Sequence, residues 1–147
     1  MTNCILCSNI ALSKDDKRKG DLTMTTTASL LDFHRSAIAE LNKPDFDDGT
    51  YELATLKPVE FSKGYQVTFC QVGDDYSHGA YEYLVNLFRE NSSDGKVYLG
   101  KFEGEPEVSF HFSVKKTAIR FAKAFNQISI WDWKACDEIK TGGTGKR

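Results

Sequence analysis

The chain has 147 residues, the length of a single domain, and its 19 basic and 21 acidic residues give a formal net charge of −2. With 40% hydrophobic and 12% aromatic residues, the composition excludes a wholly disordered chain, a collagen-like repeat and a histone-like basic protein. No apolar run approaches the roughly 18 residues that a membrane-spanning helix needs, so we expect no membrane association.

Residues 1–23 precede a second methionine, Met24, and contain the basic run 17–19. Purine-rich codons like those of a bacterial ribosome-binding site can encode that run, which favours translation from Met24. Two interpretations stay open: a flexible N-terminal arm and a mis-annotated leader. Cys4 and Cys7 have the C-x-x-C spacing of half a zinc site, but no matching second pair follows. We therefore expect no metal and no cofactor, and the scattered cysteines fit a reducing cytoplasm.

A single α+β domain is predicted over residues 24–140. It opens with a helix over 27–42, for which Thr27 is the expected N-cap. The helix has an apolar stripe at three- and four-residue steps, made of Leu30, Leu31, His34, Ala37, Ile38 and Leu41. Pro44 ends this helix, and residues 50–54 then alternate like a short strand.

After residue 64 the pattern is more regular. Alternation predicts strands at 65–72, 97–102, 107–112 and 128–133, and apolar stripes predict a helix from its cap Ser77 to Glu90 and another from its cap Ser113 to Phe125. The order β-α-β-β-α-β is the split βαβ, or ferredoxin-like, pattern. It predicts an antiparallel sheet with strand order 4-1-3-2 and two helices on one face. The glycine-rich residues 141–147 are expected to form a flexible tail.

Alternation also divides the strand residues between the two faces of the sheet. The face toward the helices is expected to carry Val67, Phe69, Val108, Phe110, Ile128 and Ile130, with Phe121 packing onto it from the following helix. The opposite face is expected to carry Thr68, Cys70, Ser109, His111, Ser129, Trp131, Trp133 and Tyr98. Two tryptophans side by side make an apolar patch that needs cover. Either the helix over 27–42 or a second copy of the chain supplies it, and we expect the helix, because its stripe otherwise has nowhere to pack. Glu107→Ala, on the same strand as Phe110, is expected to be nearly silent.

Charge is unevenly distributed along the chain. Residues 44–112 carry 13 acids and 5 bases, a balance of −8, whereas residues 113–147 carry 8 bases and 3 acids, a balance of +5. Lys116, Arg120 and Lys123 follow one another at four- and three-residue steps and form a basic stripe on the predicted helix. Such a stripe is either the solvated face of an amphipathic helix or a phosphate-contacting surface.

Cys70, His111 and Asp132 are the set that offers a nucleophile, a base and an orienting acid. Nothing in the sequence determines their separation or activates the thiol, so we expect no catalytic residues. RNA-recognition modules stack bases on aromatic residues of the central strands, whereas here the large aromatics lie on predicted edge strands. The candidate binding residues come from this sheet face and from the basic stripe. They are Trp131, Trp133, Tyr98 and His111, together with Lys116, Arg120 and Lys123.

Four stretches of the second half, 95–100, 106–111, 126–132 and 138–143, carry a recognisable pattern. Over about residues 50–143 the chain resembles small uncharacterised proteins carried by phages and conjugative elements of gut Firmicutes. The resemblance implies a bacterial cytoplasm and an accessory role for a mobile element, and it transfers no functional residue.

The function expected from these observations is that of a non-enzymatic interaction protein with a protein partner. Inhibition of a host defence nuclease is one specific form of that role. The alternative is a nucleic-acid-binding module that uses the basic helix over 114–125 and the C-terminal tail. A monomer and a homodimer both stay open.

Overall fold

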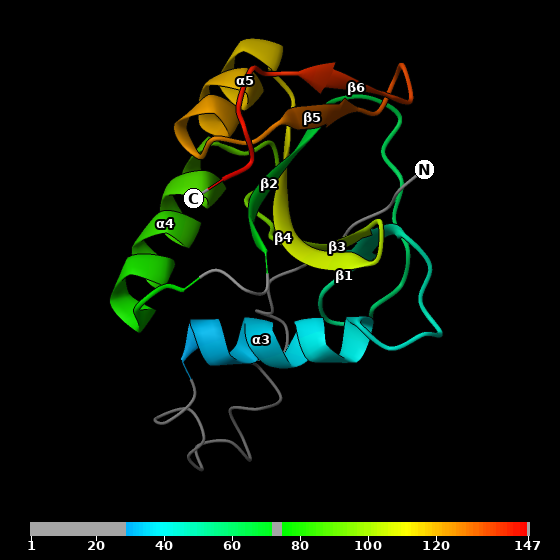
Figure 1. Cartoon of the computed structure of the whole chain (residues 1–147), viewed down its shortest axis with the longest axis vertical. Helices are drawn as coiled ribbons and strands as arrows, with labels where there is room; N and C mark the ends of the chain where they lie inside the picture. Colours follow the sequence, from blue (N-terminus) through cyan, green and yellow to red (C-terminus); the bar gives the residue numbers. More distant parts are fainter. Residues whose placement is uncertain (1–28, 72–74, 147) are drawn as a thin grey trace.

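One curved antiparallel sheet organises residues 29–71 and 75–146, which this computed structural model describes (Figure 1). The elements along the chain are α3 (Leu30–Leu41), β1 (Gly49–Glu52), β2 (Tyr65–Gln71), α4 (His78–Asn91), β3 (Tyr98–Phe102), β4 (Glu105–Phe112), α5 (Lys115–Ala124), β5 (Ser129–Asp132) and β6 (Asp137–Lys140). In Figure 1 the helices lie around the outer, convex side of the sheet. The prediction of an α+β chain with an antiparallel sheet is confirmed.

The sheet is larger than the sequence predicts. Its strand order is β1-β3-β4-β2-β5-β6, so β1 and β6 extend the four predicted strands at the two edges. The four-stranded ferredoxin-like topology is therefore not confirmed. The sequence does not predict β6, because Asp137–Lys140 holds a single apolar residue, Ile139. Its extended shape comes from antiparallel pairing with β5, in which Ile139 lies opposite Ile130.

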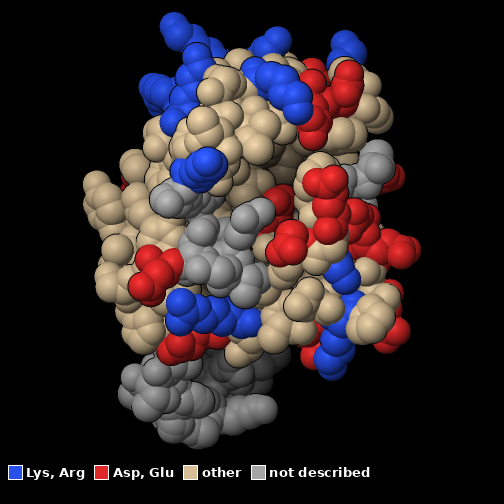
Figure 2. Space-filling model, viewed as in Figure 1, with Lys and Arg blue, Asp and Glu red and all other residues tan. Residues whose placement is uncertain are grey.

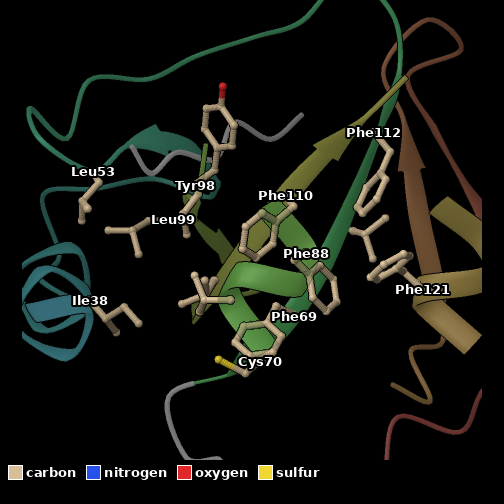
Figure 3. Packing of buried hydrophobic residues seen from close by; sticks show 14 of the residues in the cluster. Ile38, Leu53, Phe69, Cys70, Phe88, Tyr98, Leu99, Phe110, Phe112 and Phe121 are labelled. Atoms are coloured by element: carbon tan, nitrogen blue, oxygen red, sulfur yellow. The ribbon is translucent and has the colours of Figure 1, made fainter. Parts of the chain in front are cut away.

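Helix α3 packs on the convex side of the sheet and beside α4. Its N-cap is Ser29, whose hydroxyl accepts a hydrogen bond from the backbone N–H of Asp32 at 3.1 Å. The proposed cap Thr27 and the segment 1–23 lie outside the described residues. The apolar stripe joins the main core, where Ile38 lies in the same cluster as Leu99 (Figure 3). The expectation that this helix covers the tryptophans is wrong, because its stripe packs on the other side of the sheet.

An aromatic core fills the space between the helices and the sheet. The ring of Phe88 on α4 lies 5.0 Å from that of Phe69, 4.9 Å from that of Phe110 and 4.7 Å from that of Phe121 (Figure 3). All four side chains are buried. The predicted inward positions of Phe110 and Phe121 are confirmed.

A β-bulge in β2 changes the predicted alternation. Thr68 pairs with Ser109 but Cys70 pairs with Val108, so Phe69 is an extra residue in its strand. Phe69 and Cys70 are consequently both buried in the core. The placement of Cys70 on the opposite face was therefore wrong. Ile128 was also misplaced: it precedes β5 and is 50% exposed instead of facing the helices.

Residues 141–146, which we call the C-terminal strap, lie against the turn that follows α5. The side chain of Asn126 makes three of the contacts: Nδ2 donates to the Thr144 hydroxyl at 2.7 Å and to the Lys146 carbonyl at 2.6 Å, and Oδ1 accepts from the Thr144 backbone N–H at 3.0 Å. The Thr141 backbone N–H donates to the Ile128 carbonyl at 2.9 Å. The segment predicted as a flexible tail is thus hydrogen-bonded to the domain over these residues.

Truncating Phe110 tests the aromatic core. Phe110→Ala should lower the free energy of unfolding by about 3–5 kcal/mol, because it leaves a large cavity among packed rings. Tyr83→Ala, at a position on α4 that is 68% exposed, should change it by less than about 1 kcal/mol. Urea unfolding followed by circular dichroism measures both values. Equal midpoints for Phe110→Ala and the parent chain would contradict the register assigned to β4.

Candidate binding groove

The concave side of the sheet holds a groove of about 580 Å³. Because the sheet is curved, residues from its two ends line the same space. Phe102 comes from the β3–β4 hairpin, and Trp131 and Lys140 come from β5 and β6. The C-terminal strap adds Thr144 and Gly145 to the lining. The groove therefore depends on segments that are far apart in the strand order.

Asp48 holds the hairpin at the end of the groove in place. Glu103 and Gly104 form its two-residue turn, and both have positive φ angles, of 51° and 81°. The carboxylate of Asp48 accepts the backbone N–H of Glu103 at 2.7 Å and that of Gly104 at 3.0 Å. These bonds stabilise a backbone shape that a glutamate seldom adopts, and they position Phe102, which is 41% exposed.

Glu107 lies on the central strand β4 and lines the groove from the sheet. Its neighbour on β3 is Gly100, which has no side chain, and beyond it lies the small side chain of Thr50 on β1. Burial of the carboxyl raises the pKa of Glu107 to about 7; the hydrogen bond from Thr68 opposes this rise and the negative charge of Asp48 adds to it. Glu107 is therefore half-buried, and the expectation that Glu107→Ala is nearly silent stays a prediction.

Four apolar side chains line the groove beside these polar groups: Phe102, Ile128, Ile130 and Trp131. Among the described residues, the indole N–H of Trp131 is buried and has no hydrogen-bond partner. A buried donor without a partner costs stability, and such costs are characteristic of functional sites. Trp131 is thus the predicted binding residue that the structure places in the groove.

The charges in the groove are mainly negative. Glu103, Glu107 and Glu138 line it, against one base, Lys140. The ammonium of Lys140 lies 2.7 Å from the carboxylate of Glu138, so this base is already paired within the chain. In Figure 2 acidic side chains gather on the right of the molecule, whereas Lys and Arg gather along the top. The groove therefore has an excess of acidic groups.

Phe61 covers another part of the concave side. The loop that carries it connects β1 to β2. The Phe61 ring stacks on His111 with centroids 3.8 Å apart, and it meets Tyr98 and Trp133 edge-on at 5.3 and 5.5 Å. These three residues are buried, so the cover that the sheet needs comes from this loop and not from α3.

Trp133 is also satisfied in its polar contacts. Its indole N–H donates to the side-chain carbonyl of Gln66 at 3.1 Å, and the amide of Gln66 donates to the Ser109 hydroxyl at 3.0 Å. The rings of Trp133 and Trp131 lie 6.5 Å apart, as side-by-side placement predicts. Only Trp131 of this pair lines the groove.

His111 and Ser93 lie within hydrogen-bond distance, a feature shared with nucleophile–base pairs. The Ser93 hydroxyl is 2.5 Å from Nδ1 of His111, and Nε2 of His111 is 2.9 Å from the Lys63 carbonyl. Since Nε2 donates to that carbonyl, Nδ1 accepts from the serine, and burial lowers the pKa of His111. The ring lies between Phe61 and Gly64, where an added Cβ would overlap it. The contacts made by His111 tie the loop to β4.

The structure separates the residues considered for nucleophilic catalysis. Cys70 is buried in the core on the convex side, whereas His111 lies on the concave side under Phe61. The hydroxyl of Tyr81 lies 2.6 Å from Nδ1 of His34, and this pair is buried in the core that also contains Cys70. The hypothesis that Cys70, His111 and Asp132 meet on one face is wrong.

The basic residues predicted for binding form a second surface. Lys116, Arg120 and Lys123 are all exposed on α5, and Arg120 lies 5.6 Å from the ring of Phe121. None of the three belongs to an ion pair among the described residues. Helix α5 packs on the convex side of the sheet, so the structure does not bring these residues together with Trp131.

No family model, curated protein or solved structure matches this chain. Within residues 29–71 and 75–146, no three His, Cys, Asp or Glu side chains are grouped as metal ligands would be. The same residues include no helix with the length and apolar character to cross a membrane.

The sequence contained a signal for Glu107 that its charge obscured. Glu107, Ser109 and His111 are alternate residues of β4, so alternation places Glu107 on the same face of the sheet as the other two. The sequence contained no comparable signal for Phe61 or Phe102, because their roles depend on how the loop and hairpin fold over the curved sheet.

Removing Phe61 tests the cover over Trp133. Phe61→Ala should admit water to the buried indole, shift tryptophan emission to the red and increase quenching by acrylamide. Phe33→Ala, at an exposed position on α3, is the matched control and should leave emission unchanged. Unchanged emission in Phe61→Ala would show that the loop does not shield Trp133.

The raised pKa of Glu107 predicts how stability depends on pH. The folded chain keeps a proton on this carboxyl up to about pH 7, whereas the unfolded chain releases it near 4.5. The folded state therefore binds more protons in this window, and the free energy of unfolding should fall by about 1–3 kcal/mol as pH rises from 4.5 to 8.

Glu107→Gln removes this contribution, so it should flatten the decline and be the more stable protein at pH 8. Glu105→Gln, an exposed position on the same strand, should keep the slope of the parent chain. Urea unfolding at several pH values measures the slopes. Parallel slopes for Glu107→Gln and the parent would contradict the assignment.

Proposed function

We propose that this chain is a non-enzymatic interaction protein that binds another protein, with the groove on the concave side as its binding site. The observation that carries the proposal is the groove itself, about 580 Å³ in volume and lined by both apolar and acidic side chains. That volume lies within the range of about 300–1,000 Å³ typical of small-molecule pockets, so the groove can take side chains of a partner but not a whole domain. Exposed apolar side chains at Phe102 and Ile128 give a partner surface to bury.

The charge of the groove indicates the chemistry of the partner. Glu103, Glu107 and Glu138 line it, and its one base is paired with Glu138. An acidic surface favours a basic partner, because complementary potentials speed encounter and disfavour acidic competitors. The occupant we propose is therefore a basic segment of a partner protein.

The expected accessory role for a bacterial mobile element agrees with this chemistry. Enzymes that cleave DNA hold its phosphates with Lys and Arg. An acid-lined groove that binds these Lys and Arg residues would compete with DNA for them. Inhibition of a host defence nuclease is thus the specific form of the proposal that can be tested with a purified partner.

A site-specific photo-crosslinker tests whether the groove is the binding site. We would place benzoylphenylalanine at Phe102 in the groove and, as control, at Tyr83 on α4, which is 68% exposed. Irradiation in an extract of the bacterium that carries the gene should cross-link one protein from position 102 and not from position 83. The purified partner should bind the parent chain, and Glu103→Lys should weaken that binding at least tenfold, whereas Glu90→Lys on α4 should not.

Two results would contradict the proposal. One is equal cross-linking from both positions, and the other is a partner whose affinity is insensitive to Glu103→Lys. If the purified partner cleaves DNA, the nuclease form further requires that the parent chain slows cleavage and that Glu103→Lys restores it. Cleavage that the parent chain leaves unchanged would remove that form and leave the binding proposal in place.

A nucleic-acid-binding function is the second candidate, because α5 exposes three basic residues that form no ion pair among the described residues. Fluorescence anisotropy with labelled duplex DNA and single-stranded RNA, at 50 and 200 mM salt, measures it. Affinity that falls steeply with salt, and is lost in Lys116→Glu but kept in Glu103→Lys, would establish this function.

A further inference from the structure

We infer that Glu107 is the anchor of the groove and that its carboxylate takes one guanidinium or ammonium group from the bound partner. The inference rests on the proposed function and adds a residue-level specificity to it. The ligand group is the cationic end of a partner's side chain. Phe102 and Trp131 line the same groove as Glu107 and would lie beside this group.

Among the residues that the structure describes, the surroundings of Glu107 leave most of its carboxylate without a partner. Thr68 supplies a hydrogen bond, whereas an ionised carboxylate has about four acceptor positions. Gly100 on the neighbouring strand has no side chain to offer. Glu107 belongs to no ion pair among the described residues. A carboxylate held partly out of water in this way gains most from a ligand that donates charged hydrogen bonds.

The charged groups around Glu107 select a cation. Asp48, just before β1, and Glu103, in the hairpin, add negative potential, whereas the charge of Glu138 on β6 is balanced by Lys140. Lys140 is paired with Glu138, and the ammonium of Lys101 donates to the Lys43 and Phe46 carbonyls instead of facing the groove. An anionic ligand would be repelled by Asp48 and Glu103 as well as by Glu107, and an uncharged one would leave the carboxylate unpaired.

The aromatic side chains favour the same class of ligand. Phe102 is 41% exposed and Trp131 is partly exposed, and both line the groove that Glu107 lines. A cation over an aromatic face is attracted by the ring. A guanidinium suits this combination best, because it is planar, stacks on rings and can donate two parallel hydrogen bonds to one carboxylate.

A pair of synthetic peptides tests the inference without a known partner. Amidated hexa-arginine supplies guanidinium groups, and amidated hexacitrulline has nearly the same shape but no charge. Titration calorimetry, with tryptophan emission as a second readout, should show hexa-arginine binding at pH 8 and at least tenfold weaker binding of hexacitrulline. Glu107→Gln should weaken hexa-arginine binding at least tenfold, and Glu105→Gln should change it less than twofold.

The pH dependence gives a readout that a general surface attraction would not. Affinity of the parent chain should fall several-fold between pH 8 and pH 6, because burial keeps the pKa of Glu107 near 7, and Glu107→Gln should lack this change. Hexa-arginine should also lower the carboxyl pKa of Glu107, followed by carbon-13 NMR of the folded parent chain. That measurement needs no variant to fold.

Equal losses in Glu107→Gln and Glu105→Gln, or no movement of the Glu107 pKa with hexa-arginine, would overturn the inference. Its failure is distinct from that of the proposed function. A partner that still cross-links from position 102 in Glu107→Gln would leave the groove as the binding site and remove Glu107 as its anchor. If peptide binding depends on Glu107 but no partner cross-links from position 102, the inference on Glu107 is kept and the proposed protein-binding function is contradicted.

Discussion

Strand β4 lies in the middle of the sheet, and the difference between its two sides organises the rest of the molecule. Val108, Phe110 and Phe112 face the helices, whereas Glu107 lines the groove and His111 lies under Phe61. Because strand side chains alternate, pairing with β4 decides which residues of β2 and β3 enter the core. A shift of one residue would place three apolar side chains in the groove and a carboxylate in the aromatic core.

Curvature turns one side of this sheet into a groove. The helices take up the convex side, and a bulge at Phe69 adds a local twist to β2. Phe102 and Trp131 then line one space although their strands are not neighbours. Irregular segments complete the surface: the loop that carries Phe61 covers part of the concave side, and the C-terminal strap lines the end of the groove. The site is thus formed by tertiary packing more than by any local motif.

This origin explains what the sequence could predict. Helical stripes and alternating strands report local geometry, and they located three helices and the strands around β4, as well as the inward positions of Phe110 and Phe121. The bulge at Phe69, the pairing that creates β6 and the cover by Phe61 depend on contacts between distant segments. Trp131 was found because alternation is local. Glu107 was passed over because charge on a strand usually means solvent, whereas its raised pKa and its place in the groove lining depend on the folded sheet.

Glu107 lowers the stability of the folded chain, and it lies in the open groove. Ionising Glu107 is unfavourable in the folded chain, and a neutral glutamine or threonine there would fold with less penalty. Proteins carry such local costs mainly at functional sites and compensate for them elsewhere in the fold. The basic surface of α5 lies on the other side of the sheet, so the cationic partner that we propose would be attracted to the groove and repelled by α5. Added salt weakens attraction at either surface alike, so salt dependence alone cannot distinguish a protein partner from a nucleic acid, whereas charge reversal at one surface can.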